Sequence, residues 1–253
     1  MAKAAKKAKG RKATYVLWLA SPNTAAVELA RLLGYDGVCL DLEHGVFERE
    51  TMDRLILLAR ASGLTSYARI AAPTRIDIQQ VLDSGGDGVI IPHVENLAHA
   101  RELSSYAKYP PAGDRSVGGG RTWAYTAPPA NWTQRENRRV KCYPMIETAG
   151  ALTDVEAVLK LGNVDGVFLG PFDLNMSRGR KGTFGKDDAA DRKTVADAAV
   201  AAGKDWGMNV YSTGDMKAAA ALGLTFAALT DDITALSDAL TRTLADAKKI
   251  VGR

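Results

Sequence analysis

Two acidic residues, Glu147 and Asp173, stand near the ends of short apolar runs and have the chemistry of metal ligands. The run YPMIET reaches Glu147, and the run DGVFLGPFDL contains Asp173. The segment between these runs repeats its apolar residues at helical spacing, which predicts a strand, a helix and a strand. Such a unit makes its two strands parallel neighbours, about 4.8 Å apart. We therefore expect the two carboxylates to converge on one small cation.

The ligand types at this predicted site favour a hard divalent ion. No Cys and His cluster accompanies the two acids in the sequence, so Mg2+ or Mn2+ suits them better than structural zinc. Two carboxylates leave about four octahedral positions for waters and a chelating substrate. An α-keto acid would fill two of these positions. The alternative for Asp173 is a helix cap, which is a common role for an acid after a strand.

Asp41, His44 and Arg69 have the chemistry of proton transfer and oxyanion binding. His44 lies in the motif DLEHG at a predicted strand end, beside acids such as Asp41 that are able to orient its ring. A satisfied structural histidine is the alternative. Arg69 ends the run SYAR, where its fixed charge would either stabilise an oxyanion next to a metal or pair with a neighbouring acid.

The elements that must position these residues alternate between strand-like and helix-like patterns along the chain. The predicted strands are residues 15–20, 37–45, 66–70, 88–96, 143–147, 165–174, 206–212 and 226–230. The predicted helices are residues 24–33, 49–62, 76–83, 97–107, 151–164, 187–202, 216–222 and 233–251. Residues 109–139 and 175–186 show neither period, and we predict irregular structure there.

Eight strand and helix units in 253 residues predict a single eight-fold β/α (TIM) barrel with parallel strands. An open doubly wound sheet is the alternative, but the first predicted turn, ASPNTAA, has no glycine fingerprint. In a barrel, the residues just after the strands share the face where active sites lie. The residues predicted at this rim are Asp41, Glu43, His44, Arg69, His93, Glu95, Glu147, Asp173, Ser212, Thr213, Asp231 and Asp232.

The positive charge of the chain is concentrated in a predicted tail. The net charge is +4, and residues 1–13 hold six of the 33 Lys and Arg but no acid. Without them, 27 basic residues face 29 acidic ones, so the predicted barrel, residues 14–253, is slightly acidic. We expect a disordered tail, with weak contact to RNA or a membrane surface as the alternative. The barrel itself suggests no nucleic-acid partner.

Hydropathy and cysteine content predict a cytoplasmic protein. No apolar run approaches the ~20 residues that span a bilayer, so we expect no membrane association. The tail lacks the apolar segment of a secretory signal. Cys39 and Cys142 both fall in predicted buried strands, where a free thiol behaves as a small apolar group. Two such residues suggest a reducing compartment and no disulfide framework.

Several runs together resemble the class II pyruvate aldolases of the HpcH/HpaI family, which includes 2-dehydro-3-deoxyglucarate aldolase and 4-hydroxy-2-oxoheptanedioate aldolase. They are GYDGVCLDLEHG, Arg69, PHVEN followed by YPPAGDRSVG, MIET and GPFDL, and they occur in order over residues 15 to about 240. The resemblance implies a barrel enzyme, an aldehyde-lyase. Such enzymes reversibly cleave 4-hydroxy-2-oxo acids to pyruvate, or another 2-oxo acid, and an aldehyde, with a divalent cation: Mg2+ or Mn2+, with Co2+ as a further candidate.

The resemblance also implies roles for single residues. Glu147 and Asp173 match the metal ligands, and His44 matches the general base. Asp41 matches its supporting acid. Arg69 matches the residue that polarises the keto oxygen and, with the cation, stabilises the pyruvate enolate.

Other roles implied by the resemblance concern substrate binding and assembly. The amides of Gly170 and Phe172 match those that hold the pyruvate carboxylate. Asp83, in the run VLDSGG, matches an acid that reaches a neighbouring subunit's site. A homo-oligomer, a trimer or a hexamer, is therefore expected.

The chain departs from the family pattern at three places. Phe172 is bulky where relatives carry a small residue, and the loop at residues 116–133 is rich in glycine and aromatic residues. The seventh predicted strand ends VYST, so Tyr211 or Ser212 would add a polar contact where relatives tend to be apolar. These departures leave the aldehyde specificity open.

Two other functions compete with the aldolase interpretation. An acyl-CoA lyase of the malyl-CoA or citramalyl-CoA type uses a similar barrel and acid pair. It would need a basic groove for phosphates, which only the run SRGRKG at residues 177–182 offers. A barrel that binds oxo acids without catalysis would lack a base or a ligand, and no such residue is missing here.

Overall fold

The computed structural model describes residues 12–180 and 186–252. Most of the predicted tail, residues 1–13, lies outside the described residues, as does the segment 181–185 of the second predicted irregular stretch. At the start of the described chain, Lys12 Nζ lies 3.2 Å from Asp36 Oδ1.

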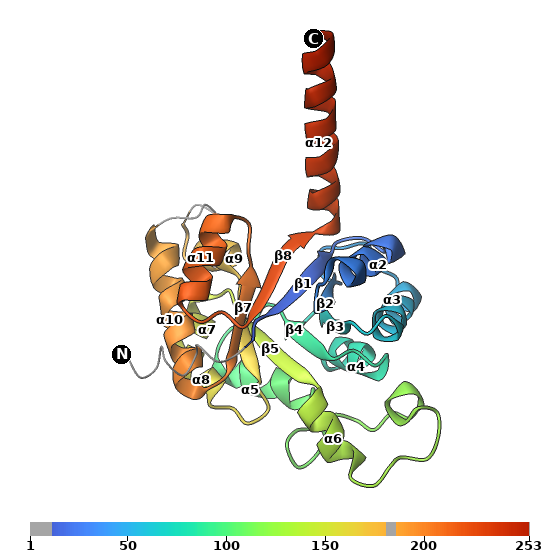
Figure 1. Cartoon of the computed structure of the whole chain (residues 1–253). Coiled ribbons are helices and arrows are strands. Elements are labelled where there is room, and N and C mark those ends of the chain that lie inside the picture. The colour runs from blue at the N-terminus through green and yellow to red at the C-terminus, as the bar shows by residue number, and fades with distance from the viewer. Residues whose placement is uncertain (1–11, 181–185, 253) are drawn as a thin grey trace.

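Within this part of the chain the strands form one closed, parallel barrel, in which each strand pairs with the next and the last pairs with the first. The strands are β1 (Thr14–Leu19), β2 (Gly37–Asp41), β3 (Thr65–Arg69), β4 (Gly88–Ile91), β5 (Lys141–Ile146), β6 (Gly166–Leu169), β7 (Asp205–Asn209) and β8 (Phe226–Asp231). Figure 1 shows them at the centre of the molecule, with helices outside. The predicted barrel fold is confirmed.

The helices mostly follow the strands as the apolar periodicity predicted. They are α2 (Thr24–Leu33), α3 (Arg49–Ala61), α4 (Arg75–Asp83), α5 (Leu97–Ser105), α6 (Trp132–Arg139), α7 (Ala149–Thr153), α8 (Val155–Leu159), α9 (Pro171–Ser177), α10 (Lys186–Ala202), α11 (Thr213–Ala221) and α12 (Asp232–Val251). None of those described is long and apolar enough to cross a lipid bilayer.

The core has two layers because successive residues of a strand point to opposite faces. The smaller cluster takes alternate residues such as Val16 and Trp18, and it fills the barrel. The larger cluster takes the intervening residues, such as Leu17 and Leu19, and packs beneath the helices. The free Cys39 belongs to the inner layer and the free Cys142 to the outer one, so both predicted burials are confirmed.

The strands predicted at residues 37–45 and 88–96 end early, at Asp41 and Ile91, and the helix predicted at residues 151–164 is divided into α7 and α8. At two further places the predicted type of structure is wrong. The predicted irregular stretch 109–139 contains the 3-10 helix η1 (Gly120–Trp123) and helix α6. The segment WTQRENRR of α6 buries no residue completely, so it carries no apolar period for the sequence to show. The predicted strand 165–174 ends at Leu169, and α9 begins at Pro171. Proline is favoured at the first helical position because its missing N–H needs no partner there.

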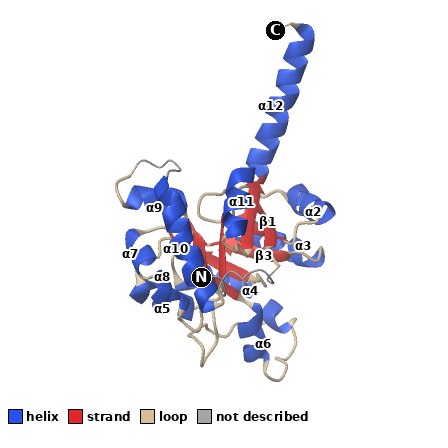
Figure 2. Ribbon diagram, turned by 60° about the vertical axis from the view of Figure 1, so that its left-hand side comes forward, coloured by secondary structure: helices blue, strands red, loops and turns tan. Residues whose placement is uncertain are grey.

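Helix α12 leaves the barrel instead of packing along it. Figures 1 and 2 show it projecting from the end of β8, with the C-terminus at its tip. Its leucines at positions 236, 240 and 244 are 55%, 61% and 57% exposed. They recur every four residues and so form one apolar stripe along the helix.

Candidate active site

The centre of the rim is a buried ion pair between Asp41 and Arg69. The two residues are register partners on β2 and β3, which brings the ends of the two strands level. Arg69 Nε lies 3.0 Å from Asp41 Oδ1, and Nη2 lies 2.6 Å from Oδ2. Burial would raise the pKa of Asp41, but the hydrogen bonds and charge of Arg69 hold it below its ordinary value. The pair is therefore charged and fixed as a two-point fork.

Asp41 fixes the backbone that carries His44, not the imidazole ring. Its Oδ1 accepts a hydrogen bond from the His44 amide at 3.1 Å, while Oδ2 accepts one from Trp18 Nε1 at 3.1 Å. Neither of these contacts is to the imidazole ring, so the support of the ring by Asp41 stays a prediction. The turn is closed by Gly45, where a Cβ would lie 2.3 Å from the Asp41 carbonyl oxygen.

The site also contains Glu43, to which the sequence had given no role. Its carboxylate is 8% exposed and lies between two cationic or cation-forming groups. Arg69 Nε is 3.1 Å from Oε2, and His93 Nε2 is 2.6 Å from Oε1. The ring of His44, which is 67% exposed, is nearest to Glu43 as well, at 3.9 Å between Nε2 and Oε2. Glu43 thus joins the groups that follow β2, β3 and β4.

Glu147 follows β5 and is almost fully buried beneath the loop after β4. The backbone N–H of His93 donates to its Oε1 at 2.5 Å. His93 adopts φ of 54°, a left-handed conformation that is uncommon for a residue with a side chain. Thr148, not Glu147, caps α7, because its side chain accepts from the Ala151 amide. This leaves the Glu147 carboxylate available to the site.

The pKa of Glu147 is raised above its ordinary value. Burial is the largest cause of its raised pKa, and the charges of Asp173 and Glu43 raise that pKa further. The His93 amide opposes the shift. Asp173 is therefore close enough for its charge to act on Glu147. The predicted convergence of these acids is supported by this coupling.

Asp173 reaches the rim from a helix and not from a strand end. It is exposed in the first turn of α9. The preceding Gly170 lies against Glu147, since a Cβ there would lie 2.9 Å from Glu147 Oε2. The Gly170 N–H donates to the Ile146 carbonyl at 3.1 Å. That amide is used within the barrel, which argues against its predicted contact with a substrate carboxylate. Phe172 meets Tyr211 edge to face, with 5.9 Å between ring centroids.

These residues fit a divalent cation, judged by their charges. Glu147 and Asp173 are oxygen donors. Burial is the main cause of the raised pKa of Glu147, the charge of Asp173 adds to it, and a bound cation would offset both effects. The described residues form no cage of three or more His, Cys, Asp or Glu around one point. A two-carboxylate site with open positions is the type that Mg2+ occupies when substrate completes the shell.

Other acids and hydroxyls of the predicted rim have structural roles. Asp231 caps α12, with Oδ1 accepting from the Thr234 amide at 2.7 Å. Asp232 is buried and accepts from Ser21 Oγ at 2.5 Å, and Ser212 caps α11. Asp231 thus has the capping role that was the alternative for Asp173.

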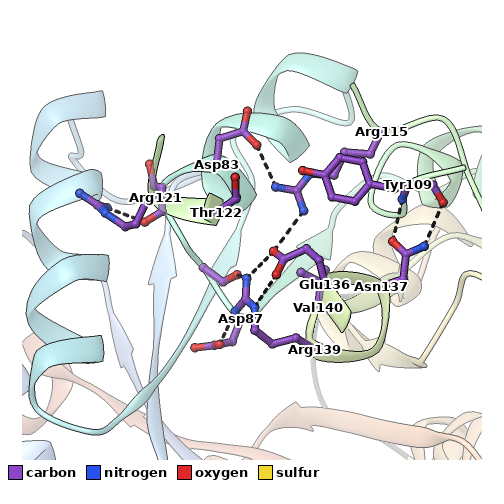
Figure 3. A network of polar contacts seen from close by, with 12 residues as sticks. Asp83, Asp87, Tyr109, Arg115, Arg121, Thr122, Glu136, Asn137, Arg139 and Val140 are labelled. Carbon is purple, nitrogen blue, oxygen red and sulfur yellow. Dashed lines mark hydrogen bonds and ion pairs between the residues drawn. The ribbon is translucent and has the colours of Figure 1, made fainter. Parts of the chain in front are cut away.

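Asp83 lies away from this group. It is the last residue of α4, which returns from the end of β3 to the start of β4, so it lies at the opposite end of the barrel. Figure 3 shows it in a polar network, where Arg115 lies 2.8 Å from Asp83 Oδ1 and 3.4 Å from Glu136 Oε1. Arg139 continues the network from Glu136 to Asp87. Within one chain, Asp83 does not join Glu147 and Arg69.

Comparison with known proteins identifies the family of this chain. The model of the HpcH/HpaI aldolase/citrate lyase family matches residues 14–239. The chain belongs to this family. Its relatives include the hydroxypyruvate/pyruvate aldolase of Rhizorhabdus wittichii, 30% identical over 92% of this chain and 93% of that one. A 2-keto-3-deoxy-L-rhamnonate aldolase of Klebsiella pneumoniae is also 30% identical, over 90% of this chain and 86% of that one.

Solved structures of the HpcH/HpaI family share the barrel. An HpcH/HpaI aldolase from Desulfitobacterium hafniense DCB-2 superposes with a TM-score of 0.87 at 27% identity, covering 96% of this chain and 95% of that one. The predicted family, the barrel and the assignment as an aldolase, a carbon–carbon lyase, are therefore confirmed. The roles predicted for single residues stay predictions.

Proposed function

We propose that this HpcH/HpaI aldolase is a divalent-metal-dependent class II enzyme that cleaves 4-hydroxy-2-oxo acids to pyruvate and an aldehyde. One observation carries the proposal: the buried Glu147 lies within reach of the charge of Asp173, and Glu43 and His93 connect it to the clamped guanidinium of Arg69. Glu147 and Asp173 would hold the ion, Mg2+ or Mn2+ with Co2+ as a further candidate. The bound ion would supply a Lewis acid that polarises the 2-keto oxygen.

Different residues carry out proton transfer and oxyanion stabilisation during bond cleavage. His44, exposed at the rim, takes the proton of the C4 hydroxyl as general base. The C3–C4 bond breaks, the aldehyde leaves, and the electron pair moves to the keto oxygen of the three-carbon fragment. Arg69, held in place by Asp41 and Glu43, stabilises the resulting oxyanion. Protonation at C3 releases pyruvate, and the reverse sequence forms the carbon–carbon bond.

Removing the metal is expected to lower kcat/KM by at least about 1,000-fold, because a Lewis acid contributes several kcal/mol and ~1.4 kcal/mol is tenfold in rate. Stripped protein, re-supplied with Mg2+, Mn2+ or Co2+ one at a time, is assayed for pyruvate release from a panel of 4-hydroxy-2-oxo acids. Zinc-free buffer with an excess of Ca2+ serves as the control for non-catalytic ion binding. Full activity of the stripped protein would contradict a metal-dependent mechanism.

The acyl-CoA lyase alternative has little support in the described residues. In the run SRGRKG, Arg178 Nη1 lies 2.7 Å and Arg180 Nη1 3.9 Å from the same Asp191 carboxylate oxygen. This acid opposes the charge that a phosphate groove would need, although residues 181–185 lie outside the described residues. Malyl-CoA and citramalyl-CoA are therefore included in the same assay panel as the negative substrates.

We also infer that the active form is a homo-oligomer in which α12 packs against a second copy. The apolar stripe of α12 leads away from its own barrel, and a second exposed stripe at residues 29, 32 and 33 lies on α2. Two open apolar stripes on one chain suit association between copies. The predicted trimer or hexamer would bring Asp83 toward another subunit's rim.

The double variant Leu240→Glu with Leu244→Glu is expected to lower the mass measured by light scattering to that of one chain, since two charges cannot be buried in an apolar contact. Arg242→Gln, on another face of the same helix, is the matched control and should leave the mass unchanged. A wild-type mass of one chain at micromolar concentration would contradict the oligomer.

We further infer a cytoplasmic enzyme whose catalytic unit is residues 14–253. Burial raises the pKa of the Cys142 thiol to about 12, and it likewise raises the pKa of Cys39. Both thiols are thus unreactive packing groups, in accord with a reducing compartment.

A further inference from the structure

A cavity adjoins the candidate active site at the ends of β7 and β8. Its volume is about 230 Å3, and the first turns of α12 close one side. Its polar and aromatic lining includes Trp18, Asn209, Tyr211, Thr230, Asp231 and Asp238. Pockets for drug-sized ligands measure ~300–1,000 Å3. This one therefore suits a short molecule and not a CoA thioester.

The cavity shares walls with the reaction site. Trp18 lines the cavity, and the same indole lies beneath the Arg69 guanidinium, 5.3 Å from its carbon to the ring centroid. The Trp18 N–H donates to Asp41. On the other side, the Tyr211 ring meets Phe172, and its phenol lies within reach of the charges of Arg69 and Asp173. A molecule that reacts beside Arg69 would extend into this cavity.

Asn209 lines the cavity, and its side chain has a buried acceptor that the described residues leave unsatisfied. It is the last residue of β7. Its Nδ2 donates to Tyr211 Oη at 3.4 Å, whereas its Oδ1 is buried and has no hydrogen-bond partner among the described residues. A buried carbonyl oxygen without a donor carries a desolvation cost. A ligand hydroxyl would remove that cost by donating to Oδ1.

The charges around the cavity indicate which ligands it would accept. Asp231 and Asp238 contribute two carboxylates to the lining, and the described lining includes no Lys or Arg. Carboxylates repel an anionic ligand and accept hydrogen bonds from hydroxyl groups. The cavity therefore favours a neutral molecule with hydroxyl donors over an acidic or phosphorylated one.

We propose that this cavity is the subsite for the aldehyde, that it selects short neutral hydroxyaldehydes, and that Asn209 is the residue that recognises their hydroxyl group. The assignment rests on the proposed aldolase function, because it concerns the second product of that reaction. Asn209 Oδ1 accepts from the hydroxyl group of the aldehyde, while Nδ2 of the same amide donates to Tyr211 Oη. Phe172 and Trp18 enclose the carbon chain.

The test compares matched pairs of aldehydes in the addition reaction with pyruvate. Glycolaldehyde is paired with acetaldehyde, and glyceraldehyde with propanal, so each pair differs in hydroxyl groups. Succinic semialdehyde, which carries a carboxylate, tests whether the enzyme discriminates against an anionic aldehyde. Wild-type enzyme is expected to give a higher kcat/KM for the hydroxylated member of each pair and the lowest value for the semialdehyde. Asn209→Ala is expected to lower the hydroxyl preference about 3- to 10-fold, the range of one neutral hydrogen bond.

Asn163→Ala removes an amide at the opposite end of the barrel and is the matched control, for which the preference should not change. Tyr211→Phe, which removes the hydroxyl that holds the amide, is expected to lower the preference in the same direction and extends the test if Asn209→Ala folds poorly. An equal loss of rate with both members of a pair, or an unchanged ratio, would overturn the role of Asn209.

Exchange of the pyruvate C3 protons for deuterium, followed by NMR without aldehyde, separates the two levels of the proposal. Exchange with no hydroxyl preference would overturn the subsite alone. Absence of both exchange and aldol product would overturn the aldolase mechanism, and the subsite with it.

Discussion

The variant Glu147→Gln is expected to be more stable than the wild-type protein without metal and to lose at least about 1,000-fold in aldolase activity. The pKa of Glu147 is raised, first by burial and then by the charges of Asp173 and Glu43. A raised folded-state pKa means that the protonated form is favoured on folding. The contribution of Glu147 to the free energy of unfolding is therefore most favourable below the ordinary Glu pKa of about 4.3. It is lost as the pH rises through the pKa of the folded state. Gln removes this cost at neutral pH.

The same change should remove the response to metal. A ligand that binds only the folded state raises the melting temperature by mass action, so 5 mM Mg2+ or Mn2+ should stabilise the wild-type protein but not Glu147→Gln. Melting curves at pH 7 with and without metal measure both effects, and pyruvate release measures activity. A variant that is less stable without metal, yet still stabilised by Mg2+, would contradict the role of Glu147.

Glu136→Gln is the control, for which the expected change in stability at pH 7 has the opposite sign. Glu136 lies in the network of Figure 3, and its side chain is 11% exposed. Burial would raise its pKa, but hydrogen bonds and charge from Arg139, with help from Arg115, lower it. Its stabilising effect is present above the ordinary Glu pKa and is lost as the pH falls through the folded value. Its replacement by Gln should therefore destabilise the protein at pH 7 and leave the metal response intact.

Arg69→Met is expected to destabilise the fold by about 3–5 kcal/mol, because it leaves the buried carboxylates of Asp41 and Glu43 without their cation. Activity should fall by at least about 100-fold, the loss typical of one oxyanion-stabilising group. Arg69→Lys keeps the charge but not the two-point fork, so it should recover stability better than activity. Urea unfolding and deuterium exchange at pyruvate C3 measure the two properties separately.

Two further variants isolate the Asp41–Arg69 pair. Asp41→Asn combined with Arg69→Met should cost less than the sum of the single changes, because the second substitution removes the charge that the first leaves unpaired. Arg54→Met breaks an exposed pair with Glu50, in which both side chains are 75% exposed, and should cost less than about 1 kcal/mol. Additive effects of the first two changes would contradict a coupled pair.

The sequence predicted the barrel and most of its rim because both depend on local patterns. Apolar runs such as YVLWLA report strands buried on both faces, and the topology then places strand-end residues together whatever the loops do. Asp41, Arg69 and Glu147 were found in this way. Asp83 was assigned only by resemblance, and within one chain it lies at the other end of the barrel.

Local sequence patterns did not predict the contacts between side chains that follow different strands. Glu43 becomes a bridge between Arg69 and His93 only because the turn after β2 directs it inward. The Gly170 amide is used by Ile146, and α6 has no apolar face for periodicity to report.

By itself, the sequence determined that this chain is a β/α barrel with acids and an arginine at one end, because the local hydropathy pattern predicts which segments are buried strands and in what order they follow. The tertiary structure decided which atoms of those residues meet. That outcome depends on strand register, on the left-handed backbone of His93 and on the helical start of α9, which bring groups from distant parts of the chain to one rim.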